Sequence, residues 1–303
     1  MKIIVTGSLG HISKPLTEEL VSKAHSVTVV SSKQEKQKDI EAMGAKAAIG
    51  SIEDVAFLTT TFTGADAAYI MEPPVNFFDK SIGIPEFYSN IARCYVEAIR
   101  QSGLKQVVHL SSIGGHTDKG NGMLAFHYYV EQIIQSLPAD VSITTLRPVG
   151  FYYNLLSFIP GIKHGAGIVT NYNASYKEPW VAPADIAAVV AEEITQPFKG
   201  RKVRYIASDE LTGNDIATIL GEAIGKPDLQ WTAIPDEQQK HVLLSFGMSE
   251  QAAKGLVEMN AARQTGTLFE DYNRNKPILG KTKLSDFAKE FAEVYNKPNH
   301  IEA

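Results

Sequence analysis

Short β-branched runs alternate with helical patterns through the first half of the chain, and this alternation limits the fold more than any other feature. The runs are four or five residues long and mostly apolar, which suits a parallel sheet covered by helices on both faces. Parallel strands need crossovers, and these are right-handed. We therefore predict an α/β fold with a doubly wound parallel sheet of the Rossmann type. The predicted strands are residues 3–6, 27–31, 46–49, 67–71, 107–111 and 143–146, with helical patterns over 13–23, 84–100 and 123–135.

After residue 150 the alternation loosens, and the second half looks like a smaller part. Its aromatic and glycine-rich start has no clear period, and helical patterns dominate farther on. We predict a nucleotide-binding domain over residues 1–150 and a smaller, mostly helical C-terminal lobe over residues 151–303, which lends a strand and helices to the first domain. A cleft between two such parts is a common place for a substrate. The predicted elements are a strand over residues 203–207, helices over 185–194 and 213–224, and three helical pieces over 235–295.

Charge and cysteine content exclude several classes of protein. The chain has 303 residues and a net charge of −5, and neither half is basic, so we expect no nucleic-acid partner. Cys94 is the single cysteine, which excludes an internal disulfide framework, and the histidines lack metal-ligand spacing, so we expect no metal. The longest apolar run has six residues, 186–191, and Gly7 comes too early for a secretory signal. We expect a cytoplasmic protein without a membrane partner.

A glycine turn follows the first predicted strand directly. Its spacing, Gly-x-x-Gly-x-x-Ser, places Gly7 where a tight turn is needed and Gly10 where the backbone can approach a pyrophosphate at the start of a helix. Ser13 stands where a third glycine would pack the helix on the strand. The pattern is weak alone, but its place between strand and helix supports it; the alternative is a plain tight turn. The predicted cofactor contacts are Gly7, Leu9, Gly10, His11 and Ile12.

The end of the second predicted strand distinguishes between two dinucleotides. An NAD site usually places an acid there for the ribose 2′-hydroxyl, but the first acid after this strand is Glu35. Ser32 and Lys33 stand at the strand end and could hold a 2′-phosphate instead. We therefore predict NADP(H) as the cofactor; the alternative is that these two residues belong to a solvated turn.

Two further segments leave predicted strands at the carboxyl edge of the sheet, where ligands bind in open α/β folds. Met71 and Pro73 follow the fourth strand, and Pro148 and Phe151 follow the sixth. We expect the first pair near the cofactor ribose and the second near the nicotinamide. Aromatic residues beyond the sixth strand could form a pocket for a flat substrate, the alternative being ordinary core packing. They are Phe151, Tyr152, Tyr153, Phe158 and Tyr172.

Four motifs lie at the ends of predicted strands and helices beyond the glycine turn. They are Val107-Val108-His109-Leu110-Ser111-Ser112, His127-x-x-x-Glu131, Leu146-Arg147-Pro148 with Phe151 and Asn154, and Trp180-Val181-Ala182-Pro183-Ala184-Asp185-Ile186-Ala187. With the glycine turn, they make the chain resemble the NmrA-like family of atypical short-chain dehydrogenases/reductases over nearly its whole length. The resemblance implies a Rossmann fold and bound NADP(H), and it leaves a homodimer open. Its known members include NADPH:quinone reductase-like enzymes and redox-sensing regulators that do not turn the cofactor over.

The helix after the fifth strand departs from most short-chain dehydrogenases, whose Tyr-x-x-x-Lys pair relays a proton. Here His127 and Glu131 stand four residues apart and share a helix face. We expect the carboxylate to orient the imidazole and to raise its pKa, which would suit a general acid. Ser111 stands where the resemblance implies a hydroxyl that polarises the substrate. The alternatives are a surface pair without chemistry, a turn serine, and Tyr128 or Tyr129 as the acid.

Together these features predict an NADPH-dependent oxidoreductase that reduces a small quinone or carbonyl compound. The nicotinamide would carry the hydride, and the protein would supply position and a dry pocket. The main alternative is a non-catalytic NADP(H) redox sensor that acts through a protein partner. A closed aromatic cleft would favour the enzyme and a filled one the sensor. A sugar-nucleotide enzyme is a weaker alternative, because this helix lacks Tyr-x-x-x-Lys.

Overall fold

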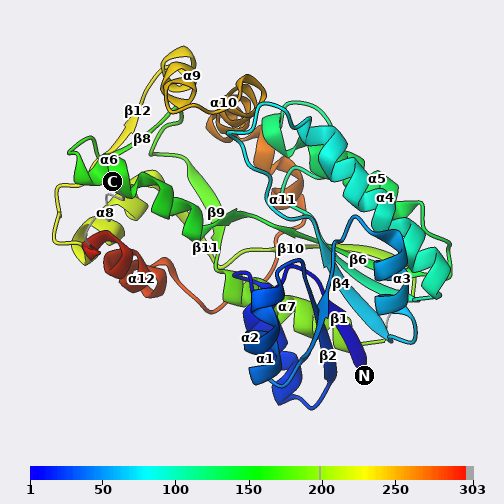
Figure 1. Ribbon diagram of the computed structural model, residues 1–303. Helices are drawn as coiled ribbons and strands as arrows, with labels where there is room; N and C mark the ends of the chain where they lie inside the picture. Colours follow the sequence, from blue (N-terminus) through cyan, green and yellow to red (C-terminus); the bar gives the residue numbers. More distant parts are fainter. Residues whose placement is uncertain (198, 298–303) are drawn as a thin grey trace.

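The computed structural model describes residues 1–197 and 199–297, and its main sheet has seven strands in the order β10-β6-β5-β4-β1-β2-β3 (Figure 1). Every neighbouring pair in this sheet is parallel. The predicted doubly wound fold is confirmed, and each strand begins and ends within two residues of its predicted bounds. The strands are β1 (Lys2–Val5), β2 (Ser26–Ser31), β3 (Lys46–Ile49), β4 (Ala67–Met71), β5 (Gln106–Leu110), β6 (Ser142–Pro148) and β10 (Arg201–Ile206).

The order of the strands reverses between β1 and β4. From β1 the chain builds β2 and β3 on one side, and it then places β4, β5 and β6 on the other side. At such a switch point the connections after neighbouring strands part, which leaves room for a ligand outside their carboxyl ends. The glycine turn after β1 and the segment after β4 both lie at this point, so the topology itself positions the predicted cofactor site.

Alternate side chains of each strand enter one of two cores. In β1, Ile3 and Val5 share a core with Leu16 of α1, whereas Ile4 shares the other core with Ile91 of α4. The sheet is therefore apolar on both faces, as its short apolar strands predict. The first face is covered by α1 (Ser13–Ser22), α2 (Gln37–Ala42) and α7 (Pro183–Thr195), and the second by α3 (Val55–Phe62), α4 (Ile84–Ser102) and α5 (Ala125–Gln135).

The second lobe has a core of its own and contains more β-structure than predicted. Tyr152, Trp180, Trp231 and Phe291 lie in this core. Two small sheets, ordered β11-β9-β7 and β12-β8, form part of the lobe. Their strands have two to five residues and no regular period, which is why a mostly helical lobe was expected. Its elements are β7 (Gly150–Phe151), β8 (Ile168–Thr170), β9 (Lys177–Val181), β11 (Asp209–Thr212), β12 (Trp231–Ala233), α6 (Ile159–Lys163) and α8 (Gly213–Ala223), with the 3-10 segments η3 (Tyr152–Phe158) and η4 (Thr267–Phe269). Two further 3-10 segments, η1 (Gln34–Lys36) and η2 (Gly122–Leu124), lie in the first half of the chain.

The stretch that was predicted as three helical pieces is broken more often. It forms α9 (Asp236–Ser245), α10 (Glu250–Thr265), α11 (Glu270–Arg274) and α12 (Leu284–Asn296). Between α11 and α12 the chain returns to the main sheet, where the Gly280 N–H donates to the Ala207 carbonyl (2.8 Å). A Cβ at Gly280 would lie 2.2 Å from Asp185 Oδ2, so this close passage depends on glycine. Within the described ranges, no helix is long and apolar enough to cross a membrane.

Candidate functional site

The glycine turn after β1 is held by its own hydrogen bonds. Gly7 has a φ of +89°, a conformation that favours glycine, and its carbonyl accepts from the Gly10 N–H (3.1 Å). The Ser13 hydroxyl donates to the Thr6 carbonyl (2.7 Å) and would lie 2.6 Å from a Cβ at Gly7. Ser13 therefore does the work of the expected third glycine, because its small side chain ties α1 closely to β1.

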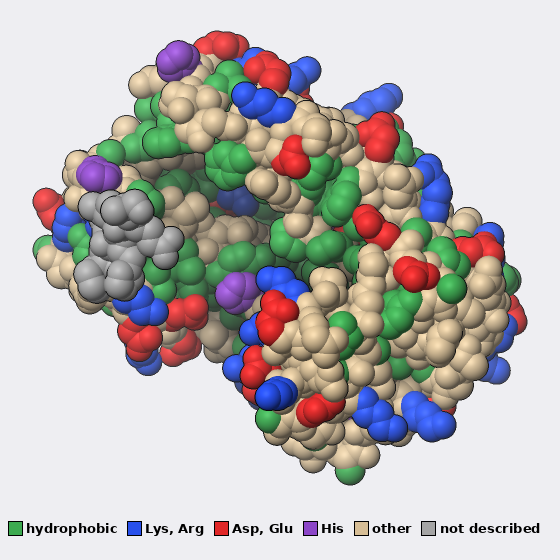
Figure 2. All heavy atoms as spheres, in the orientation of Figure 1, with side chains coloured by type: hydrophobic (Ala, Val, Ile, Leu, Met, Phe, Trp, Pro, Cys, Tyr) green, Lys and Arg blue, Asp and Glu red, His purple; other side chains and the backbone are tan. Residues whose placement is uncertain are grey.

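The turn meets the second lobe through an aromatic stack. The exposed His11 ring lies 4.6 Å from the Tyr153 ring at an interplanar angle of 17°, and Phe151 packs beside Tyr153 with 5.2 Å between ring centroids. Figure 2 shows that the surface is hollowed between the sheet and the second lobe, with hydrophobic side chains along the hollow. Of the predicted pocket, Tyr153 therefore contacts the glycine turn through His11, and Phe151 packs on Tyr153.

The rest of the predicted aromatic pocket belongs to the core of the second lobe. Tyr152 and Tyr172 are buried there, and Phe158 packs against Trp231 with 6.0 Å between ring centroids. The prediction of a pocket role is wrong for Tyr152 and Tyr172, because the lobe needs their rings to fill its centre. Core packing, the alternative reading, describes these two residues.

At the end of β2, one serine is buried and has a structural role, and the two residues after it are exposed. Ser31 is buried, and its hydroxyl oxygen accepts from the Ser8 hydroxyl (2.9 Å) and from the Lys33 N–H (3.2 Å). The side chains of Ser32 and Lys33 are exposed beside the glycine turn. This arrangement fits a nucleotide with a 2′-phosphate, because a cation and a hydroxyl stand where an NAD site usually has an acid. Contact of either residue with the cofactor stays a prediction.

The segments after β4 and β6 reach the same edge. The Met71 N–H donates to Thr6 Oγ1 (3.1 Å), and the Met71 sulfur would lie 3.1 Å from a Cβ at Gly7. Pro148 ends β6, and its carbonyl accepts from the Ile113 N–H (2.8 Å). Pro73 is half-buried beyond Met71. Met71 thus lies against the glycine turn, whereas Pro148 lies at the same edge of the sheet on β6, and contact of Met71, Pro73 or Pro148 with a cofactor stays a prediction.

The predicted pair of His127 and Glu131 is wrong. Glu131 is buried and accepts two hydrogen bonds from Arg147, Nε to Oε1 (2.9 Å) and Nη2 to Oε2 (2.7 Å). The Ser111 hydroxyl donates to Glu131 Oε1 (2.5 Å). Arg147, rather than His127, binds the Glu131 carboxylate because its planar guanidinium group matches both oxygens. A charged partner also stabilises a buried carboxylate. Ser111 is thereby bound to Glu131, although a role in catalysis stays a prediction.

This cluster extends into the second lobe. Arg147 Nη1 donates to Asp271 Oδ2 (3.2 Å), and the Tyr205 hydroxyl donates to the same oxygen (2.5 Å). We call Ser111, Glu131, Arg147, Tyr205 and Asp271 the arginine cluster. Because Arg147 lies in β6 and Asp271 in α11, the cluster joins the main sheet to the second lobe.

His127 has the opposite charge state from the one expected. Burial, with a further contribution from His109, lowers the pKa of His127 to about 3. Its Nδ1 is buried and bonds no atom of the described residues. The ring packs against Phe126 at 4.0 Å between centroids. His127 is therefore neutral near pH 7.

A second buried pair, which the sequence interpretation missed, lies behind His127. His109 Nε2 is 3.3 Å from Glu72 Oε2, and both side chains are almost completely buried. Burial alone would lower the pKa of His109, but the charge of Glu72, their hydrogen bond and the charge of Glu131 raise it above the ordinary value. The signal was available in the sequence: His109 interrupts an apolar strand, and Glu72 follows the neighbouring strand at the same edge.

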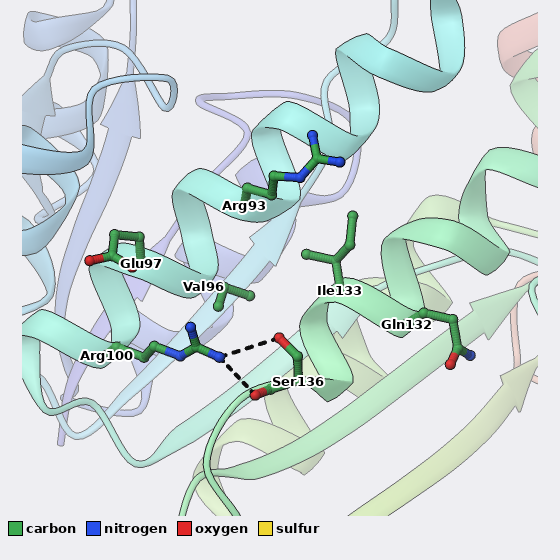
Figure 3. Close-up of a pocket in the computed structure, with 7 residues that line it drawn as sticks. All are labelled: Arg93, Val96, Glu97, Arg100, Gln132, Ile133 and Ser136. Atoms are coloured by element: carbon green, nitrogen blue, oxygen red, sulfur yellow. Dashed lines mark hydrogen bonds between the residues drawn. The ribbon is translucent and has the colours of Figure 1, made fainter.

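Two surface grooves lie away from these residues. One, of about 490 Å³, runs between α4 and α5, where Arg100 reaches across to the Ser136 carbonyl (2.9 Å; Figure 3). The other, of about 320 Å³, lies on the second lobe beside Tyr176 and Tyr272. Neither is lined by a predicted site residue. In the part of the chain that the structure describes, no cluster of three His, Cys, Asp or Glu side chains could hold a metal.

Comparison with known proteins agrees with this geometry. The chain is 22% identical over 296 residues to an NAD(P)H azoreductase of Xenophilus azovorans, covering 97% of this chain and 99% of the relative. A structure of an NADPH-dependent quinone oxidoreductase from Escherichia coli, complexed with NADPH, matches with a TM-score of 0.78 and 20% identity over 95% of this chain and 99% of that chain. A triphenylmethane reductase of Citrobacter sp., complexed with NADP(H), matches with a TM-score of 0.76 and 19% identity over 96% and 99%.

The family assignment rests on a match along the whole chain. The family model described as the NmrA-like family matches residues 1–303. This agrees with the resemblance drawn from the glycine turn and the four strand-end and helix motifs. The chain therefore belongs to the NmrA-like family.

Proposed function

We propose that the protein is an NADPH-dependent oxidoreductase that reduces small, flat, conjugated acceptors such as quinones. The observation that carries this proposal is the glycine turn at the switch point, closed by Ser13 and flanked by Ser32 and Lys33 rather than by an acid. The turn supplies backbone N–H groups for a pyrophosphate at the start of α1. The two exposed residues supply a hydroxyl and a charge for the 2′-phosphate.

NADPH supplies the hydride when it is bound. The chain's own residues bind the dinucleotide along Gly7–Ile12, shield one side with Met71 and Pro148, and present Phe151 and Tyr153 to the acceptor. Flat rings stack on aromatic side chains, so this edge suits a planar acceptor. The substrates that the names of the azoreductase, the quinone oxidoreductase and the triphenylmethane reductase indicate are conjugated compounds of this kind. We infer a cytoplasmic enzyme, because a chain with one cysteine suits a reducing compartment.

Steady-state oxidation of NADPH with a panel of quinones, azo dyes and aldehydes tests the proposal. We expect turnover with the quinones, and we expect Gly10→Val to remove both turnover and NADPH binding while the protein stays folded. A Cβ at Gly10 would lie 3.1 Å from the Gly7 carbonyl oxygen, and the valine branches would enter the space of the pyrophosphate. Tight NADPH binding without turnover of any acceptor would contradict the enzyme and support the redox sensor.

A further inference from the structure

The buried pair of Glu72 and His109 belongs to a cluster whose polar atoms are left unsatisfied. Eight buried side-chain atoms in the described residues have no hydrogen-bond partner, and three of them are Glu72 Oε1, His109 Nδ1 and His127 Nδ1. Buried polar atoms are normally bonded, so a concentration of exceptions indicates a site rather than a structural core. We call Glu72, His109 and His127 the histidine cluster.

The members of the histidine cluster interact electrostatically. Burial lowers the pKa of His109, but the charge of Glu72 and their hydrogen bond raise it, and His109 lowers the pKa of His127 in addition to the larger effect of burial. His109 and His127 each have a buried Nδ1 without a hydrogen-bond partner among the described residues. His127 as a residue is half-buried, whereas His109 is fully buried.

We propose that Glu72 and His109 hold the proton that a quinone needs in addition to the hydride, and that His127 delivers it; this rests on the proposed oxidoreductase function. A quinone becomes a hydroquinone when it gains one hydride and one proton. The N–H bond of the His109 imidazolium breaks, neutral His127 accepts a proton on one nitrogen and releases one from the other, and an O–H bond forms on the acceptor. His109 then regains its proton from water. Glu72 acts as a positioning residue, because it works through His109.

The titratable groups that interact with Glu72 or His109 leave His109 as the group that changes charge near neutral pH. Burial raises the pKa of Tyr88 on α4 to about 12, and burial also raises the pKa values of Tyr95 on α4 and Tyr69 on β4. On α5, His127 is neutral, and Glu131 is bonded to Arg147. The three phenols therefore keep their protons over the pH range in which His109 gains and loses its own.

The first test needs no turnover. Histidine-labelled protein without cofactor is titrated by NMR, and His109→Gln identifies the His109 signal. We expect His109 to titrate above the ordinary histidine range, and Glu72→Gln to lower its midpoint by about one pH unit or more. Glu72→Asp, which keeps the charge, should retain part of the rise. A His109 that titrates normally in the parent would overturn the proposal.

The second test compares two acceptors that differ in their need for a proton. 1,4-Naphthoquinone needs a hydride and a proton, whereas crystal violet is a cation that a hydride alone converts to its neutral form. We expect Glu72→Gln and His109→Gln to lower kcat/KM for the quinone by about 10²-fold or more, the usual share of general acid catalysis. Turnover of crystal violet should stay within about twofold of the parent, because no proton is transferred. His241→Gln, an exposed histidine on α9, is the matched control and should change neither.

The outcomes separate this inference from the proposed function. Equal losses with both acceptors would make the pair a structural element and overturn the inference alone. A parent that turns over neither acceptor would overturn the proposed function and the inference that rests on it. Should His109→Gln fail to fold, Glu72→Gln, which keeps the shape of the side chain, carries the test.

Discussion

The two buried acids at the carboxyl edge, Glu131 in the arginine cluster and Glu72 in the histidine cluster, have partners of different kinds. Both oxygens of Glu131 are bonded to Arg147, whose guanidinium stays charged at any pH that the protein survives. Glu72 has a single contact, to a histidine that can release its proton, and its other oxygen has no partner among the described residues. The first arrangement suits a fixed joint between parts of the molecule. The second suits a group that changes its charge.

The largest effect is expected in the arginine cluster. Arg147→Met leaves the buried Glu131 carboxylate without a cation, and Met cannot bond to it. We expect a loss of about 3–5 kcal/mol in the free energy of unfolding, measured by urea denaturation. The double variant Arg147→Met with Glu131→Leu should recover most of this loss, because it leaves no buried charge. A single variant that loses less than about 1 kcal/mol would contradict the role of the cluster as a joint.

The histidine cluster should make the protein sensitive to acid. The native pKa of His127 is about 3, below the ordinary value of 6.5, so below pH 6.5 the unfolded chain binds a proton that the native state does not bind. The free energy of unfolding should therefore fall as the pH falls, by about 2 kcal/mol at pH 5.

The control for this acid effect is His127→Gln, which should remove that part of the pH dependence. His109 works in the other direction: its pKa is raised in the native state, so its stabilisation is present below pH 6.5 and is lost as the pH rises through the native value. His127→Gln should therefore change the acidic end of the pH profile of the free energy of unfolding, and His109→Gln should change the alkaline end. Urea denaturation at pH 5 and pH 7.5 measures the difference. An unchanged profile in His127→Gln would place the acid sensitivity elsewhere.

The smallest effect on stability is expected at Glu72. Glu72→Gln removes the carboxylate, but His109 can then lose its proton, so no charge is left buried without a partner. We expect the free energy of unfolding at pH 7.5 to change by about 1 kcal/mol or less. A loss as large as that of Arg147→Met would mean that the pair of Glu72 and His109 is as structural as the arginine cluster, and the comparison would fail.

The sheet was predictable because its short, apolar strands and amphipathic helices repeat, and the switch point follows from their order. The geometry of the glycine turn was predictable because glycine spacing reflects local backbone needs. The environment of His127 and Glu131 was not predictable, because two residues on one helix face can each bind side chains of the neighbouring strand instead of each other. Arg147 stood in a quoted motif, yet its bond to Glu131 depends on the packing of α5 over β6. The strands of the second lobe are too short to show a recognisable alternation of apolar and polar residues in the sequence.

Isothermal titration of the parent protein with NADPH and with NADH at moderate salt tests most directly whether the glycine turn and the acid-free end of β2 form an NADPH site. One charge-assisted hydrogen bond to the 2′-phosphate contributes roughly 1.5–3 kcal/mol, so Ser32 and Lys33 should make the Kd for NADPH at least about tenfold lower than that for NADH. Equal affinities, or tighter binding of NADH, would contradict the account, because neither residue would then recognise the 2′-phosphate.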